Sequence, residues 1–149
     1  MSSRTQATRP AALIVEIRRF IAGAIFFNQR VAERFHLNLT DTQCLNILEL
    51  TGPATPSQLA AHTGLTSGGV TVVLDRLQKA GFIKREPNPR DRRSILIRTV
   101  PSGMERIHPM YNEIHRGMEA LMGNFSGKEL EVVVKFFEQA HRMRSERSL

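Results

Sequence analysis

Apolar positions recur with a helical period at both ends of the chain. In residues 11–35 an apolar side chain returns every three or four positions, the spacing of one buried helical face. Flanking apolar residues widen that face beyond half of the circumference. A helix of about 37 Å, at 1.5 Å per residue, needs more cover than a small domain supplies, so the pattern favours a second subunit. The apolar set is Leu13, Ile14, Ile17, Phe20, Ile21, Ala24, Ile25, Phe26, Phe27, Val31 and Phe35.

Two shorter helices are predicted next, each with its own start signal. "LTDTQCLNILEL" predicts the first, in which Thr40 caps the helix and Gln43 returns the hydrogen bond as a capping box. "TPSQLAAHTG" predicts the second, in which Thr55 and Gln58 form the box and Gly64 ends the helix. The two signals place a compact helical region directly after the long helix.

A third short helix carries a polar and basic outer face. Val70, Val73, Leu74 and Leu77 fall at i, i+3, i+4 and i+7, so they predict the buried side of an amphipathic helix that ends at Gly81. Two short helices joined by a glycine-containing turn, the second with a polar outer face, form a helix-turn-helix. That outer face presents Gly68, Thr71, Val72, Asp75, Arg76 and Lys79.

The segments "FIKRE" and "ILIRTV" have the alternating, β-branched pattern of strands. The loop that joins them, "PNPRDRRS", carries three arginines and one aspartate. A two-stranded ribbon with a long basic tip, placed after a helix-turn-helix, is a wing.

The chain returns to helix in residues 101–123 and again after Ser126, and Pro109 is expected to kink or interrupt the first of these helices. The predicted fold class is mainly α with a small β-hairpin (α+β), a winged helix-turn-helix with long terminal dimerisation helices. The predicted organisation is a flexible segment (1–10), an N-terminal dimerisation helix (11–37), a DNA-binding lobe (38–100) and C-terminal dimerisation helices (101–149).

Charge is concentrated in the predicted lobe. The chain carries a net charge of +7. Residues 76–98 contain eight basic residues and only two acidic ones, Glu86 and Asp91. A local excess of this kind indicates a polyanionic partner. The single cysteine excludes an internal disulfide, and no apolar run approaches a membrane span, so a cytoplasmic protein without a membrane partner is expected.

The order of elements and three stretches of sequence resemble the MarR family of winged helix-turn-helix transcriptional regulators. The stretches are "LTDTQCLNILEL", "LTSGGVTVVLDRLQKAGFIKREPNPRDRRSILI" and Gly103 at the start of the fifth helix. The resemblance runs from about residue 11 to near the end of the chain. It implies a homodimeric regulator of transcription, more often a repressor, that binds double-stranded DNA at a pseudo-palindromic operator. It also implies a small aromatic or anionic effector bound between the dimer helices and the winged lobe.

The third short helix and the wing supply the candidate DNA contacts. Ser67 and Thr71 suit phosphates or base edges, and Val72 suits a thymine methyl group. Asp75 is expected to pair within the protein. Gly68 and Gly69 permit either close approach to DNA or close packing on the preceding helix. The full candidate set is Ser67, Gly68, Gly69, Thr71, Val72, Arg76, Lys79, Arg90, Asp91, Arg92 and Arg93.

In the wing, an arginine-only tip suits a narrow minor groove, because a guanidinium is less strongly hydrated than an ammonium. Asp91 and Arg93 lie two positions apart, on one side of an extended segment, so the carboxylate is expected to hold the guanidinium in one orientation. The resemblance implies the same roles, with Arg93 aimed at the minor groove and Asp91 orienting it.

Several other interpretations remain open at this stage. Phe20, Phe27, Met110 and Tyr111 either line an effector site or are ordinary core residues. Cys44 suggests a redox sensor or core packing, and the histidines show no i, i+4 pair that would indicate a metal site. No cofactor is predicted, and no catalytic motif is present, so an enzyme is not expected. A winged helix used only for protein contacts is the main rival.

Overall fold

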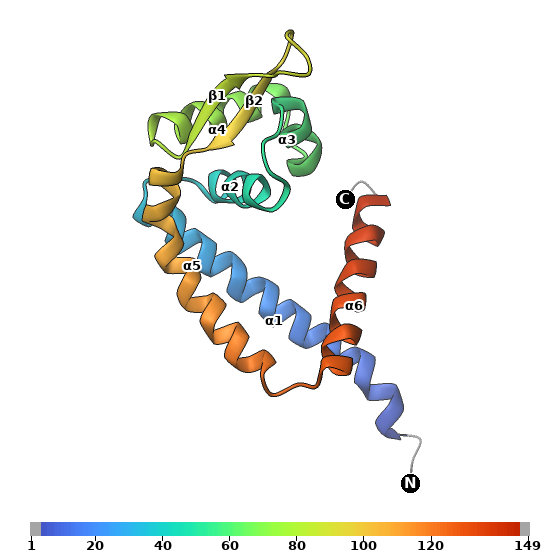
Figure 1. Cartoon of the computed structure of the whole chain (residues 1–149). Coiled ribbons are helices and arrows are strands. Elements are labelled where there is room, and N and C mark those ends of the chain that lie inside the picture. Colours follow the sequence, from blue (N-terminus) through green and yellow to red (C-terminus); the bar gives the residue numbers. More distant parts are fainter. Residues whose placement is uncertain (1–3, 147–149) are drawn as a thin grey trace. The chain divides into compact units, whose positions relative to one another are not determined.

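A computed structural model of the chain describes residues 4–146, with side chains from 9 to 144, as six helices and one antiparallel β-hairpin. The elements are α1 (Arg4–Arg34), α2 (Leu39–Thr51), α3 (Pro56–Thr63), α4 (Ser67–Lys79), β1 (Ile83–Pro87), β2 (Ile95–Thr99), α5 (Pro101–Met122) and α6 (Gly127–Glu146) (Figure 1). The chain divides into two compact units, Met1–Ile107 and His108–Leu149.

The long first helix starts earlier than the sequence predicts. It begins at Arg4, inside the stretch expected to be flexible, and it includes Pro10. The helix is continuous through Pro10, although proline has no backbone N–H to donate to the preceding turn. The helix ends where the Leu37 N–H donates to the Ala32 carbonyl at 2.8 Å, with His36 in the left-handed region at a φ of 55°.

The cap predicted for α2 differs from the one in the structure, whereas the cap predicted for α3 is confirmed. In α2 the N-cap is Asn38, whose N–H donates to Asp41 Oδ2 at 2.8 Å, so the predicted Thr40–Gln43 box is wrong. Asparagine is a strong N-cap and aspartate completes the box three residues later, which moves it by two positions. In α3 the Thr55 N–H donates to Gln58 Oε1 at 2.8 Å, and Gly64 closes the helix at a φ of +71°.

The core of the first unit lies between α2, α4 and the hairpin. The four predicted apolar positions of α4 are all buried, with exposed fractions of 4 % or less. Phe82, which follows α4, is fully buried and packs edge-on against Phe35 at 5.7 Å between ring centroids. The helix-turn-helix prediction is therefore confirmed by the packing of its apolar face.

The hairpin pairs β1 with β2 from Ile83↔Thr99 to Pro87↔Ile95, and the seven residues between the strands form the wing tip. Ala54 adds an isolated bridge to Ile97, whose side chain is fully buried. This bridge fixes the base of the wing to the segment between α2 and α3.

The first turns of α5 pack against the end of α4. A Cβ built on Gly103 would lie 2.2 Å from the Gly81 carbonyl oxygen, so only glycine fits there. Arg106 Nη2 donates to the Ala80 carbonyl at 2.5 Å, and its guanidinium lies 4.4 Å from the centroid of the Phe82 ring. The boundary between the units consequently falls inside α5, beyond the expected lobe boundary at residue 100. The helix is continuous through Pro109.

Both units carry large exposed apolar side chains on their long helices. In α1 they include Ile14, Phe20 and Phe26, with exposed fractions of 58 %, 59 % and 66 %. In α6 Val132 and Phe137 are 68 % and 54 % exposed. None of the described helices is long and apolar enough to cross a membrane.

Candidate DNA interface

The outer face of α4 is exposed along its whole length, opposite the buried apolar face. Ser67, Thr71 and Lys79 are exposed, and the apolar side chain of Val72 is 55 % exposed. An exposed valine among small and polar residues is suited to contact the edge of a base pair in a DNA groove, and it does not contribute to the protein core.

The two glycines at the start of α4 have different surroundings. A Cβ on Gly69 would lie 3.3 Å from Thr66 Oγ1 and 3.6 Å from the Leu65 Cβ, so this glycine packs on its own turn. A Cβ on Gly68 would meet no described atom within 4 Å. The protein itself gives no packing reason for glycine at position 68, which favours close approach of an external partner there.

Arg76, predicted to contact a phosphate, is engaged inside the protein. Its Nε donates to Asp41 Oδ2 at 2.8 Å and its Nη2 donates to Asp41 Oδ1 at 2.9 Å. The Asp41 side chain is completely buried, whereas that of Arg76 is 36 % exposed. The hydrogen bonds to Asp41 raise the pKa of the Arg76 guanidinium above its ordinary value.

Three of the other seven lysines and arginines of the lobe are paired as well. Arg85 on β1 bonds Asp75 at 2.6 Å and also Gln78, which confirms that Asp75 pairs within the protein. Lys84 and Arg98 bond Glu86 at 2.6 and 2.9 Å. Their hydrogen bonds lower the pKa of the Glu86 carboxyl group, so Glu86 is ionised at neutral pH.

The polar side chains of the wing bond the backbone of the loop and do not orient its guanidinium groups. Asp91 Oδ1 accepts from the backbone N–H of Arg93 at 3.0 Å, and Asn88 Oδ1 accepts from that of Arg90 at 3.0 Å. Asn88 Nδ2 also donates to Ser94 Oγ at 2.8 Å across the base of the loop. The orienting ion pair expected between the Asp91 and Arg93 side chains is not formed, because a carboxylate two residues away reaches the nearer backbone N–H first.

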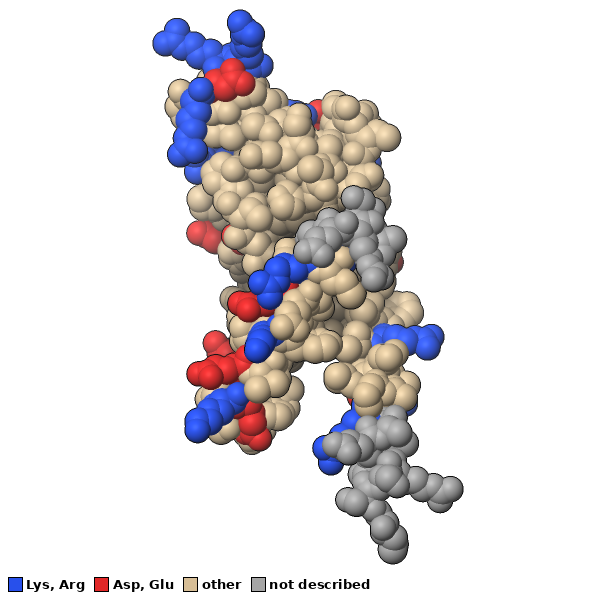
Figure 2. All heavy atoms as spheres, turned by 90° about the vertical axis from the view of Figure 1, so that its right-hand side faces the viewer, with Lys and Arg blue, Asp and Glu red and all other residues tan. Residues whose placement is uncertain are grey.

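Four cations of the lobe therefore remain without an ion pair among the described residues: Lys79 on α4 and Arg90, Arg92 and Arg93 on the wing tip. Figure 2 shows basic side chains projecting at the end of the molecule that Figure 1 assigns to the β1–β2 loop. The excess of positive charge that the sequence indicates in the lobe is thus concentrated in these four side chains.

The burial of Cys44 favours core packing over the redox role that the sequence left open. Cys44 is fully buried, and desolvation, with a smaller contribution from the Asp41 charge, raises the pKa of its thiol to about 11. A buried thiol of that pKa is a poor nucleophile. Within the described residues, no three histidine, cysteine or acidic side chains are grouped as a metal site.

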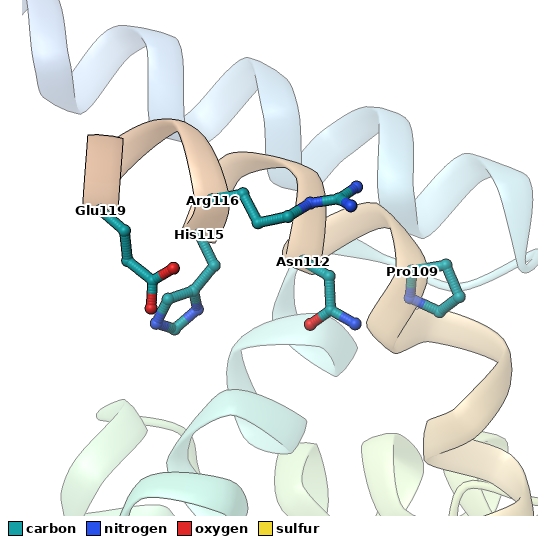
Figure 3. A pocket seen from close by; sticks show the side chains of 5 residues that line it. All are labelled: Pro109, Asn112, His115, Arg116 and Glu119. Carbon is teal, nitrogen blue, oxygen red and sulfur yellow. The ribbon is translucent and has the colours of Figure 1, made fainter. Parts of the chain in front are cut away.

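A hollow of about 600 Å³ lies along α5 and is lined by Pro109, Asn112, His115, Arg116 and Glu119 (Figure 3). Asn112, His115 and Glu119 extend from the same side of the helix. None of the predicted effector residues, Phe20, Phe27, Met110 and Tyr111, is among its lining residues. Polar residues at spacings of three and four in residues 112–119 indicate this hollow in the sequence, whereas the prediction rested on aromatic and methionine side chains.

Comparison with known proteins agrees with this geometry. The sequence model of the MarR family matches residues 37–95, from the turn between α1 and α2 to the start of β2. The HTH-type transcriptional regulator YcgE of Bacillus subtilis is 30 % identical over 141 residues, which cover 94 % of this chain and 92 % of YcgE.

The chain belongs to the MarR family.

The match to solved MarR family structures covers nearly the whole chain. The crystal structure of MarR family transcription regulator SP03579 has a TM-score of 0.69 at 23 % identity, covering 99 % of this chain and 98 % of that one. The multiple antibiotic resistance protein MarR of Salmonella typhimurium is 38 % identical over 69 residues, 45 % of this chain and 48 % of that protein. This MarR family protein is a DNA-binding transcriptional regulator and not an enzyme. That finding removes the rival reading as a module for protein contacts alone.

Proposed function

We propose that this MarR family regulator is a homodimeric, ligand-responsive repressor that reads a pseudo-palindromic operator. In each subunit α4 lies in the major groove, where Ser67, Gly68, Thr71 and Val72 face the base edges, and the wing tip follows the adjacent minor groove. The observation that carries the proposal is the separation of the lobe's cations into a paired set and the four unpaired groups of α4 and the wing.

The proposed dimer follows from the exposed apolar surface of the long helices. Several large side chains of α1 are about half exposed or more, and α6 exposes valines and phenylalanines on more than one side. Large apolar side chains exposed in such numbers are unfavourable in water and mark a contact site. A second copy of the chain supplies the same apolar surface in return, as a two-fold interface requires.

The effector is proposed to be a small anion held in the hollow on α5. Arg116 provides a guanidinium cation and His115 an imidazole N–H donor. A carboxylate is the matching chemical class, because a guanidinium binds it through two hydrogen bonds. Pro109 supplies an apolar edge, which suits the ring of an aromatic acid.

Selection of duplexes from a random pool tests the core of this proposal. The expected product is a sequence with two inverted half-sites about one helical turn apart (roughly 10 base pairs), bound by two chains per duplex in analytical ultracentrifugation. A scrambled duplex of the same composition is the control. Recovery of duplexes with no common sequence, or one chain per duplex, would refute the proposed function.

A further inference from the structure

A buried carboxylate joins the first helix of the lobe to the recognition helix α4. The side chain of Asp41 has no exposed surface, and its two oxygens accept three hydrogen bonds. One comes from the Asn38 N–H at the start of α2, and two come from the Arg76 guanidinium, 35 positions further along the chain. A buried anion is tolerated only when it is fully bonded in this way.

Arg76 occupies the edge of α4 rather than its centre. It follows the buried Val73 by three positions and the exposed Val72 by four, so it lies where the apolar face meets the outer face. From that edge the side chain extends to α2 rather than away from the protein. Two nitrogens of the guanidinium, Nε and Nη2, are engaged by Asp41.

The geometry of this pair adds a directional restraint on α4 to that of its apolar packing. A guanidinium and a carboxylate joined by two parallel bonds have one planar arrangement, which fixes distance and rotation together. Valine and leucine side chains tolerate small rotations of a helix, because apolar contacts are not directional. On the opposite edge, the Asp75–Arg85 pair is largely exposed on the aspartate side (65 %), so it restrains α4 less.

We propose that Asp41 is a positioning residue for DNA reading: through Arg76 it fixes the rotation of α4 about its own axis, and neither side chain contacts a base. The inference rests on the proposed insertion of α4 into the major groove. It deepens that proposal by naming a residue of α2, outside the recognition helix, that determines operator selectivity. It also replaces the predicted phosphate contact of Arg76 with an internal role.

The two roles of Arg76 predict opposite results for simple variants. If Arg76 binds a phosphate, Arg76→Lys keeps the charge and the affinity, and Asp41→Asn strengthens binding by removing a negative charge near DNA. If the pair positions α4, both variants lose selectivity, because lysine has no fork and asparagine has one acceptor where aspartate has two.

The experiment measures the affinity of each full-length protein for two duplexes: the one selected by the wild-type chain and a scrambled duplex of the same composition. Asp41→Asn and Arg76→Lys are each expected to lower the ratio of the two affinities by about ten-fold or more, the size of one lost base contact. Their affinity for the scrambled duplex and the salt dependence of binding are expected to stay at the wild-type values, apart from slightly tighter binding by Asp41→Asn.

Lys79→Gln is the matched control, because Lys79 lies one turn further along α4 and makes no ion pair within the described residues. It is expected to weaken binding to both duplexes equally, and so to leave the ratio unchanged. Circular dichroism and sedimentation check that every variant is folded with the wild-type subunit number.

A measurement on the wild-type protein decides the case even if a variant does not fold. The Arg76 Nε–H signal in a ¹⁵N spectrum, assigned by its loss in Arg76→Lys or by its contact with Asp41, is expected to stay protected from exchange when the selected duplex is added. Release of that proton on DNA binding, or wild-type selectivity in both variants, overturns the inference alone. A wild-type chain that does not distinguish the duplexes contradicts the proposed function as well.

Discussion

Gly103→Ala tests the close packing between α5 and the end of α4. A Cβ at this position would lie 2.2 Å from the Gly81 carbonyl oxygen, 2.9 Å from the Phe82 Cα and 3.1 Å from the Gly81 carbonyl carbon. Carbon atoms of real side chains keep at least 3.0 Å from such neighbours, so the backbones must separate by about 0.8 Å. All three neighbours are backbone atoms, and no flexible side chain can move aside.

The cost follows from two opposing terms. Overpacking of this kind costs about 1–3 kcal/mol, and the better helix propensity of alanine returns up to ~1 kcal/mol. A clash of 2.2 Å with a backbone atom lies in the upper part of that range, about 2–3 kcal/mol. The net loss is therefore about 1–2 kcal/mol, which corresponds to a fall in Tm of roughly 3–8 °C for a chain of this size. DNA affinity is expected to fall as well, because Gly81 and Phe82 fix the end of the recognition helix.

Gly117→Ala is the matched control on the same helix, since a Cβ there meets no described atom within 4 Å. It is expected to stabilise the protein by up to ~1 kcal/mol. Urea unfolding followed by circular dichroism gives both values, at one fixed chain concentration because an assembled protein unfolds in a concentration-dependent way. A Gly103→Ala protein as stable as the wild type would show that this packing argument is wrong.

Three further predictions concern the interface, the thiol and the subunit contact. Gly68→Ala is expected to keep or raise the Tm, because the added methyl group meets no described atom of the protein. It is expected to lower affinity for the selected duplex, because the methyl group would stand between α4 and the DNA. Unchanged affinity in a binding titration counts against close approach at this position. Cys44 is expected to react with a thiol reagent at pH 8 only as fast as the protein unfolds, since its pKa is about 11 and it is buried; rapid labelling of the folded protein contradicts this. Phe26→Asp is expected to yield monomers in sedimentation, whereas Leu50→Asp, at a more exposed apolar position on α2, retains the dimer. Identical behaviour of the two variants removes α1 from the interface.

Local patterns predicted the elements of the lobe because each depends on neighbouring residues. The apolar period of α4 and the Thr55–Gln58 box of α3 are decided within one or two helical turns, and both are as expected. At α2 the box predicted at Thr40 lies two positions from the one that Asn38 and Asp41 form, and the Asp41 carboxylate also binds Arg76. Spacing within α2 contains no information on a partner 35 positions away.

The charged residues of the candidate site could be counted from the sequence, but their ion pairs could be predicted only in part. Counting charges identified the lobe, but it could not separate Arg85 and Arg98, which neutralise acidic neighbours, from Arg90, Arg92 and Arg93, which do not. That separation depends on strand register, which brings Arg98 opposite Lys84 and beside Glu86. Tertiary pairing of charges is therefore the part that the pattern along the chain leaves open.

The salt dependence of DNA binding tests the central claim most directly. Four unpaired cations in each lobe give eight in the proposed dimer, so the slope of log K against log[salt] is expected to be about −7 for the wild type. Arg93→Ala is expected to make it shallower by about 2, one phosphate per subunit, and Arg98→Ala, whose guanidinium is bonded to Glu86, to leave it unchanged. A slope near zero, or equal changes in the two variants, would contradict the account.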